Sequence, residues 1–208
     1  MTDVKDAAIL DNRTAISKLD PDGALASAES LADQINQVWQ ERQQIKFAEN
    51  EIKSIANIVV AGMGGSALGA DVVWHLFKDQ LTVPMYINRD YQLPNFVDHN
   101  TLVILSSYSG DTEEILSCAK LAEEKKAKIA VISSGGKLAD IAKNNNYPSF
   151  FINAKHNPSQ QPRMAIGYSI LAFICVLSAA NLLDFQEKQL LEIIDVVNQV
   201  TDKVKIEI

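Results

Sequence analysis

Two glycine- and serine-rich loops carry the residues of this chain that are best suited to chemistry. The apolar, strand-like run Ile58–Ala61 opens into Gly62–Ser66 (GMGGS), and a second such run, Leu102–Leu105, opens into Ser106–Thr112 (SSYSGDT). Each loop leads into a helix-like stretch, so backbone N–H groups, the positive end of a helix dipole and short hydroxyls gather at one place. These groups suit an anion, above all a phosphate.

The second loop is the more specific of the two. Asp111, followed three residues later by Glu114, also fits a capping box for the next helix. Capping needs only one short polar side chain, whereas this loop offers four hydroxyls around one glycine, those of Ser106, Ser107, Ser109 and Thr112. A tetrahedral anion matches that set, so we expect binding here. Glu113 and Glu114 would then complement the helix dipole from the outer face of the first turn.

The elements that must position these loops alternate along the chain. Hydrophobic patterning predicts strands at Ile58–Ala61, Val83–Ile87, Leu102–Leu105, Ile129–Ser133 and Ser149–Ile152. It predicts helices over about 23–48, 67–77, 113–126, 137–143, 164–182 and 185–200. Short, apolar strands separated mostly by helices indicate an α/β fold, a doubly wound five-stranded parallel sheet with flanking helices. Its simplest order, 2-1-3-4-5, places both loops at the switch point where ligands bind.

Composition narrows the classes of protein. The chain has 208 residues, 47% of them hydrophobic and 22% charged, as expected for one soluble domain with a helical extension. A net charge of −7 argues against a nucleic-acid partner. Two isolated cysteines and three scattered histidines predict neither disulfides nor a metal site, and favour a cytoplasmic protein. The N-terminus lacks an apolar signal segment, and polar residues interrupt the apolar stretch 166–183, which we expect to be a buried or interface helix rather than a membrane span.

Other motifs are open to more than one interpretation. Gly62, Gly64 and Ala67 match a G-x-G-x-x-A dinucleotide fingerprint, and Asp90 lies roughly where a ribose-binding acid is needed. That interpretation leaves the hydroxyl-rich loop unexplained. The segment Ser133–Lys137 (SSGGK) is expected to be structural, at the edge of the cleft. His156 is the one histidine worth testing as a catalytic participant.

Arg163 stands at a junction between a loop and a helix, in the sequence Gln161-Pro162-Arg163. From such a position its guanidinium could reach back over the end of the sheet. The guanidinium is planar and carries neighbouring N–H donors, so it can donate two hydrogen bonds at once to phosphate or hydroxyl oxygens.

Together these motifs resemble the sugar isomerase (SIS) domain family, and most of all the N-terminal half of bifunctional phosphoglucose/phosphomannose isomerases. The resemblance rests on residues 62–69, 107–113, 161–163 and 167–168, in that order. It implies a phosphosugar-binding domain at 51–183, after an N-terminal helical extension at 1–50. The helix at 184–208 would lead into a second SIS domain that is missing here.

The resemblance also implies a reaction. Family members interconvert glucose 6-phosphate and mannose 6-phosphate with fructose 6-phosphate through a cis-enediol, as homodimers and without metal or cofactor. By resemblance, Ser107, Ser109 and Thr112 would hold the phosphate, Gly65 and Ser66 would contact the sugar, and Arg163 would stabilise the enediol. The proton-moving glutamate of the family lies in its second half, so we expect this chain alone to lack the catalytic base. Two alternatives stay open, a non-catalytic phosphosugar-binding regulatory module and a dinucleotide-binding domain.

Overall fold

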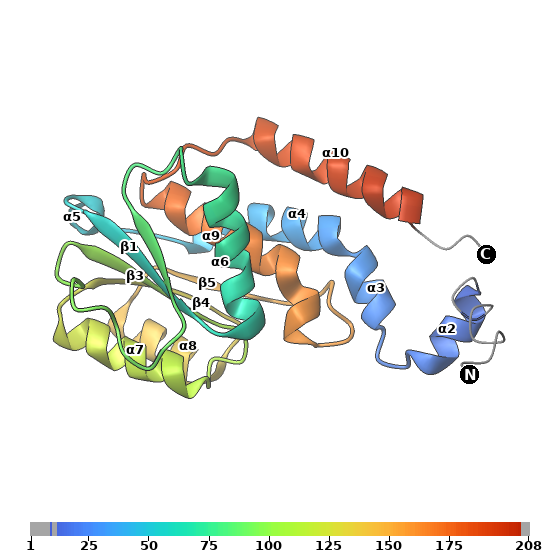
Figure 1. Cartoon of the computed structure of the whole chain (residues 1–208), viewed down its shortest axis with the longest axis horizontal. Helices are drawn as coiled ribbons and strands as arrows, with labels where there is room; N and C mark the ends of the chain where they lie inside the picture. The colour runs from blue at the N-terminus through green and yellow to red at the C-terminus, as the bar shows by residue number, and fades with distance from the viewer. Residues whose placement is uncertain (1–8, 10–11, 205–208) are drawn as a thin grey trace, which may run out of the picture.

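A computed structural model describes residue 9 and residues 12–204 of the chain (Figure 1). Five parallel strands form one sheet in the order β2-β1-β3-β4-β5. The strands are β1 (Asn57–Gly62), β2 (Met85–Asn88), β3 (Thr101–Ser107), β4 (Lys128–Ser133) and β5 (Ser149–Phe151). The predicted fold class and strand order are confirmed.

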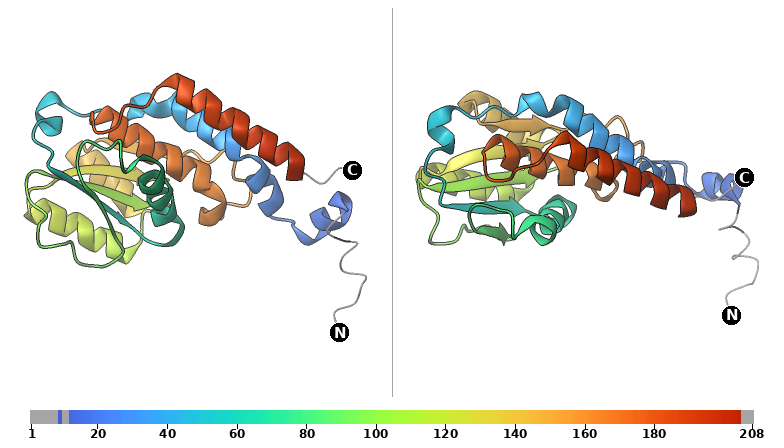
Figure 2. Two further views of the ribbon diagram at one scale, coloured as in Figure 1. Left: turned by 45° about the horizontal axis from the view of Figure 1, so that its top comes forward. Right: turned by 90° about the horizontal axis from the view of Figure 1, so that it is seen from above.

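Helices cover both faces of this sheet (Figure 1). On one face lie α6 (Gly64–Phe77) and α9 (Ile166–Ala179), with α4 (Leu31–Glu41) packed against α9. On the other lie α7 (Glu113–Glu124) and α8 (Gly136–Asn145). Alternate strand residues therefore point into two separate cores, with Ile58 and Val60 in the first and Val59 and Ala61 in the second. An outer helix, α10 (Glu187–Val204), packs on α4 (Figure 2).

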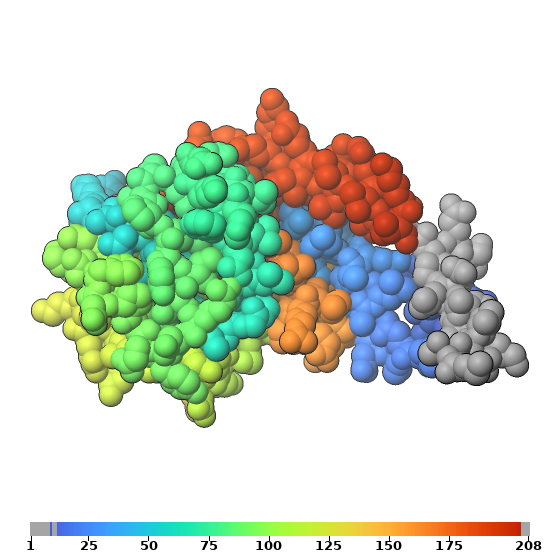
Figure 3. Space-filling model, in the orientation of Figure 1, coloured from blue at the N-terminus to red at the C-terminus, as the bar shows by residue number. Residues whose placement is uncertain are grey.

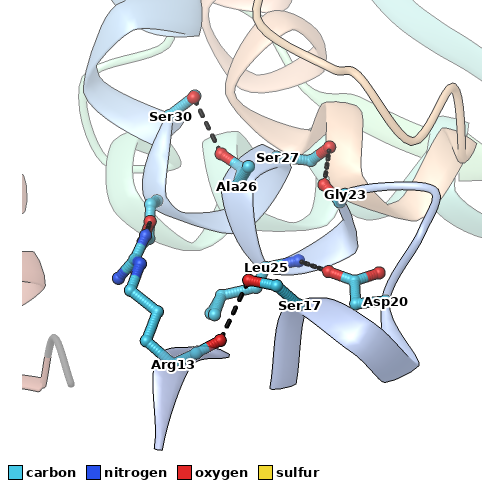
Figure 4. Close-up of polar contacts among 9 residues, drawn as sticks. Arg13, Ser17, Asp20, Gly23, Leu25, Ala26, Ser27 and Ser30 are labelled. Carbon is cyan, nitrogen blue, oxygen red and sulfur yellow. Dashed lines mark hydrogen bonds and ion pairs between the residues drawn. The ribbon is translucent and has the colours of Figure 1, made fainter. Parts of the chain in front are cut away.

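The N-terminal helix predicted over 23–48 is divided. The structure has α3 (Ala24–Glu29), α4 and a 3-10 turn η1 (Arg42–Gln44), with α2 (Arg13–Leu19) before them and α5 (Glu49–Ile52) after. At the first break the Ser30 hydroxyl donates to the carbonyl of Ala26 at 2.8 Å, a local bond that bends helices (Figure 4). The Asp20 carboxylate accepts from the N–H groups of Ala24 and Leu25, both at 2.8 Å, and thereby caps α3.

The C-terminal end of α9 differs from the predicted end at Leu182. The helix ends at Ala179 because Asn181 adopts a left-handed conformation, with φ of 58°. The N–H of Leu182 then donates to the carbonyl of Leu177 at 2.9 Å, the bond of a Schellman motif. Similarly, β2 begins at Met85 rather than Val83, since Pro84 has no N–H for the ladder.

The long apolar helix belongs to the core. Residues 162–179 are long and apolar enough to cross a membrane, and 61% of them are buried inside the fold. In the space-filling view only a small orange patch shows between α6 and the N-terminal helices (Figure 3). Ile35 and Val38 of α4 join the same core as α9 and the sheet. The domain limits at residues 50 and 183 stay a prediction.

Candidate functional site

The two predicted loops meet at the carboxyl edge of the sheet. β1 and β3 are neighbours, in a register that pairs Gly62 with Ser106. The Ser106 hydroxyl donates to the carbonyl of Ser66 at 3.1 Å, and the N–H of Tyr108 donates to the Ser66 hydroxyl at 3.1 Å. Two segments about forty residues apart in sequence thus form one surface.

Two helices begin at this surface. α6 starts at Gly64 rather than at the predicted Ala67, so Gly64, Gly65 and Ser66 form its first turn. Within residues 12–204, the N-cap side chains of α6 and α7 make no capping hydrogen bond. In the part of the chain that the structure describes, the backbone N–H groups of Thr112 and Glu113 have no hydrogen-bond partner. Uncapped N–H groups at two converging helix N-termini create a positive potential that favours an anion.

The loop hydroxyls are not equivalent. Ser107 is buried, and its hydroxyl accepts from the N–H of Gly110 at 3.0 Å and lies 2.8 Å from the Thr112 hydroxyl. Ser109 is exposed, and its hydroxyl accepts only a long 3.3 Å bond from the N–H of Asp111. Ser107 therefore shapes the turn, whereas the Ser109 hydroxyl is free to donate to a ligand.

The capping-box interpretation of Asp111 is wrong. Its carboxylate accepts from the N–H of Lys137 at 3.2 Å, so it caps the start of α8 rather than α7. The segment 133–137 lies directly beneath the loop, where the N–H of Ser134 donates to the carbonyl of Tyr108 at 3.0 Å. The negative charges of Glu114 and Glu113 raise the pKa of Tyr91, which lies in the loop after β2.

Arg163 lies on the other side of the glycine loop, in the 3-10 turn η2 (Pro162–Ala165). A methyl group built on Gly65 would sit 3.5 Å from the carbonyl oxygen of Pro162 and 3.6 Å from the Cα of Arg163. The Arg163 side chain is exposed and, among the described residues, makes no ion pair or hydrogen bond. Its five donors are therefore available to a ligand.

Beneath this surface is a cavity of about 10 Å³, the room of one water. Its lining includes Gly65, Ser66, Tyr108, Pro162 and Ser169. The Ser169 hydroxyl is buried there, and none of the residues that the structure describes is its hydrogen-bond partner. Sequence reasoning missed Ser169, because nothing in a buried apolar helix distinguishes this serine from its neighbours.

Tyr108 is the second residue that sequence reasoning missed. Its phenol oxygen accepts from the side-chain amide of Asn157 at 3.1 Å and so ties the loop to the segment before Arg163. The position of Tyr108 among the serines could have indicated a role in the loop. Its hydrogen-bond partner Asn157, however, lies 49 residues away in the sequence.

The two remaining candidates are less well placed for a site. The Asp90 carboxylate accepts from the N–H of Gln92 at 3.2 Å, a local turn bond that counts against its role in holding a ribose. The backbone of His156 donates to the hydroxyl of Tyr168 at 2.9 Å, while its ring makes no hydrogen bond within the described residues. No three histidine, cysteine, aspartate or glutamate side chains gather as a metal site in residues 12–204.

Residues 51–179 match the SIS domain family. The chain belongs to this family. Two curated relatives are named bifunctional phosphoglucose/phosphomannose isomerase. That of Caldicellulosiruptor bescii is 34% identical over 88% of this chain and 52% of its own length. That of Thermoplasma acidophilum is 35% identical over 80% of this chain and 51% of its own length. The SIS domain protein described here spans about half the length of these relatives.

A solved structure shares the SIS fold at low sequence identity. The Vibrio vulnificus NanR protein, complexed with ManNAc-6P, superposes with a TM-score of 0.55 at 16% identity. The match covers 92% of this chain and 72% of that protein. At such an identity the likeness concerns the fold alone.

Proposed function

We propose that this SIS domain is the phosphosugar-binding half of an aldose–ketose isomerase. The reaction would interconvert glucose 6-phosphate and mannose 6-phosphate with fructose 6-phosphate through a cis-enediol. The observation that carries the proposal is the hydrogen bond from the N–H of Tyr108 to the Ser66 hydroxyl, which joins two uncapped helix N-termini. The names of the curated relatives support the substrate class.

In this proposal each group has a part. The N–H groups at the start of α7 and the hydroxyls of Ser109 and Thr112 take the phosphate, while Ser107 holds the turn in shape. Gly65 and Ser66 contact the sugar. The backbone of Arg163 lies beside Gly65, and we assign its guanidinium to the sugar.

The chemistry moves one proton between two carbons. A base takes the proton from C2 of the open-chain aldose, which leaves an enediol with negative charge on O1; the hydroxyl proton then moves from O2 to O1 and the first proton returns to C1, which gives the ketose. Arg163 stabilises the charged oxygen. Glu113 and Glu114 lie in the first turn of α7, where the proposal puts the phosphate rather than C1 and C2 of the sugar. We therefore place the base outside this chain, in a second SIS domain of a cytoplasmic homodimer.

The direct test is binding of fructose 6-phosphate to the 208-residue chain by isothermal titration calorimetry. Replacing Ser109 by alanine removes a hydrogen bond to a charged group and is expected to weaken binding about tenfold. Ser17→Ala, on an exposed serine of α2, is the matched control and leaves the affinity unchanged. Absence of binding by the unmodified chain, or equal loss in both variants, would overturn the proposal.

The alternative is a non-catalytic phosphosugar-binding module. The first turn of α7 favours it, because its carboxylates, Glu113 and Glu114, lie at the proposed phosphate position rather than at the sugar carbons, and the Asp111 carboxylate already accepts from the N–H of Lys137. NanR is a SIS-fold protein complexed with ManNAc-6P. A coupled assay for fructose 6-phosphate formation separates the two, since a binding module shows no turnover even in the longest natural form of the protein.

A further inference from the structure

Gln34 of α4 is a fully buried amide that hydrogen-bonds only to backbone: once to the nearby carbonyl of Ser27, at 3.2 Å, and otherwise to distant segments. Its Nε2 lies 2.8 Å from the carbonyl oxygen of Met164 and 2.9 Å from that of His156. Its Oε1 accepts from the N–H of Gly167 at 3.1 Å. A buried amide is costly to desolvate unless it is satisfied, so these bonds fix the backbone that they contact.

The contacted backbone is the turn that carries Arg163. Met164 lies in η2 with Arg163, and Gly167 lies in the first turn of α9. One side chain therefore holds the turn at a carbonyl just after Arg163 and at an N–H three residues further on. Packing reinforces the contact, because a methyl group on Gly167 would lie 2.9 Å from the Cβ of Gln34. A short 3-10 turn has strained internal hydrogen bonds of its own, so external partners decide where it sits.

A second chain of polar contacts connects the N-terminal helices to the anion loop. The hydroxyl oxygens of Ser27 and Ser159 lie 2.9 Å apart, and Ser159 donates to the side chain of Asn157 at 2.9 Å. Asn157 in turn donates to the Tyr108 hydroxyl at 3.1 Å. Ser27 lies in α3, where its hydroxyl also contacts the carbonyl of Gly23 (Figure 4). Helices before the matched family region thus touch both sides of the candidate site.

We propose that Gln34 is a positioning residue for Arg163. It sets the height of the η2 turn above Gly65, and thereby the position of the guanidinium relative to the anion loop. The inference rests on the proposed function, in which Arg163 contacts the sugar. It adds that the N-terminal helical segment is part of the binding machinery rather than an appendage.

The test is a double-mutant cycle with fructose 6-phosphate as the probe. Gln34→Met keeps the size of the side chain and removes its donors and acceptor. Alone, it is expected to weaken binding about tenfold. In an Arg163→Ala background it is expected to have almost no further effect, because the group that it positions is gone. A loss of the same size in both backgrounds would overturn the inference.

Gln37→Met is the matched control. Gln37 is a second buried glutamine of α4, but it bonds the Glu41 carboxylate, the carbonyl of Asn153 and the hydroxyl of Tyr168, none of which belongs to the η2 turn. This variant should lose a similar amount of stability and keep its affinity within about twofold. Equal weakening by Gln37→Met and Gln34→Met would count against a specific role. If Gln34→Met does not fold, Gln34→Asn keeps a neutral amide that is one methylene too short for the same partners, and takes its place.

Amide hydrogen exchange separates this inference from the proposed function. In Gln34→Met, and not in Gln37→Met, exchange should accelerate at residues 163–167. If the unmodified chain binds no fructose 6-phosphate, the proposed function fails, and unchanged exchange in this segment would still refute the positioning role on its own.

Discussion

Gly110 and Gly135 approach so closely that a side chain on the first would overlap the backbone of the second. A methyl group built on Gly110 would lie 1.8 Å from the carbonyl oxygen of Gly135, and Gly110 has a φ of +78°. Gly110→Ala combines left-handed strain with a clash that no rotation relieves. We expect it to lower the free energy of unfolding by about 3 kcal/mol or more, measured by urea denaturation.

Gly64→Ala is the control for that prediction. Gly64 also has a positive φ, +50°, but a methyl group there meets nothing within 4 Å. Only the left-handed strain remains, at about 1 kcal/mol. Equal losses in the two variants would show that the contact with Gly135 is not the cause.

Asp111→Ala is expected to destabilise α8 rather than α7. The substitution removes the acceptor for the N–H of Lys137 and should cost about 1 kcal/mol in urea denaturation, the usual effect of losing a helix cap. Glu114→Ala is the comparison, because a capping box on α7 would need Glu114. The structure shows no such cap, so we expect this variant to change the free energy of unfolding by less than about 0.5 kcal/mol. A larger loss of stability in Glu114→Ala would support the capping-box interpretation of Asp111 and Glu114.

The sheet could be predicted from the sequence because its signals are local. Each strand is a short apolar run, and the helices between the strands require parallel pairing. The predicted end of β3 was wrong: we expected the strand to end at Leu105, and it extends to Ser107. Ser107 joins the strand by pairing with Ser133 of β4, and that partner cannot be read from local patterning.

The site could be predicted in kind but not in detail. The hydroxyl-rich loop is visible in the sequence, yet the structure shows that Ser107 bonds Thr112 while Ser109 stays exposed. Which hydroxyl is used inside the loop and which faces solvent depends on the backbone conformation of the loop. The hydrogen bonds from Gln34 to the turn that carries Arg163 could not be predicted from the sequence, because the partners His156 and Met164 lie 122 and 130 residues away.

Gly69→Ala tests the crossing of α6 and α9. A methyl group on Gly69 would lie 2.2 Å from the Oγ and 2.8 Å from the Cβ of Ser169, so the two helices would have to move apart. We expect a loss of about 2 kcal/mol in the free energy of unfolding. In a Ser169→Gly background, which removes both atoms, the added cost of Gly69→Ala should fall by about 1 kcal/mol. Strict additivity of the two changes would contradict this contact.

The two cysteines predict how stability depends on pH under alkaline conditions. Burial raises the pKa of Cys118 to about 11 and that of Cys175 to about 12. An unfolded thiol has a pKa of about 8.5, so above that pH the unfolded chain loses these protons while the folded chain keeps them. The thiols therefore leave stability unchanged below about pH 8 and reduce it as the pH rises from there toward their folded pKa values.

The measurement compares the unmodified chain with the double variant Cys118→Ala/Cys175→Ala. Between about pH 9.5 and 10.5 the unmodified chain should lose about 2 kcal/mol more of its free energy of unfolding than the variant, close to one proton per thiol. Both thiols should also resist a thiol reagent at about pH 8 until urea unfolds the chain. Parallel stability curves for the two proteins, or rapid labelling of the folded chain, would mean that the thiols ionise in the folded state as they do in the unfolded chain.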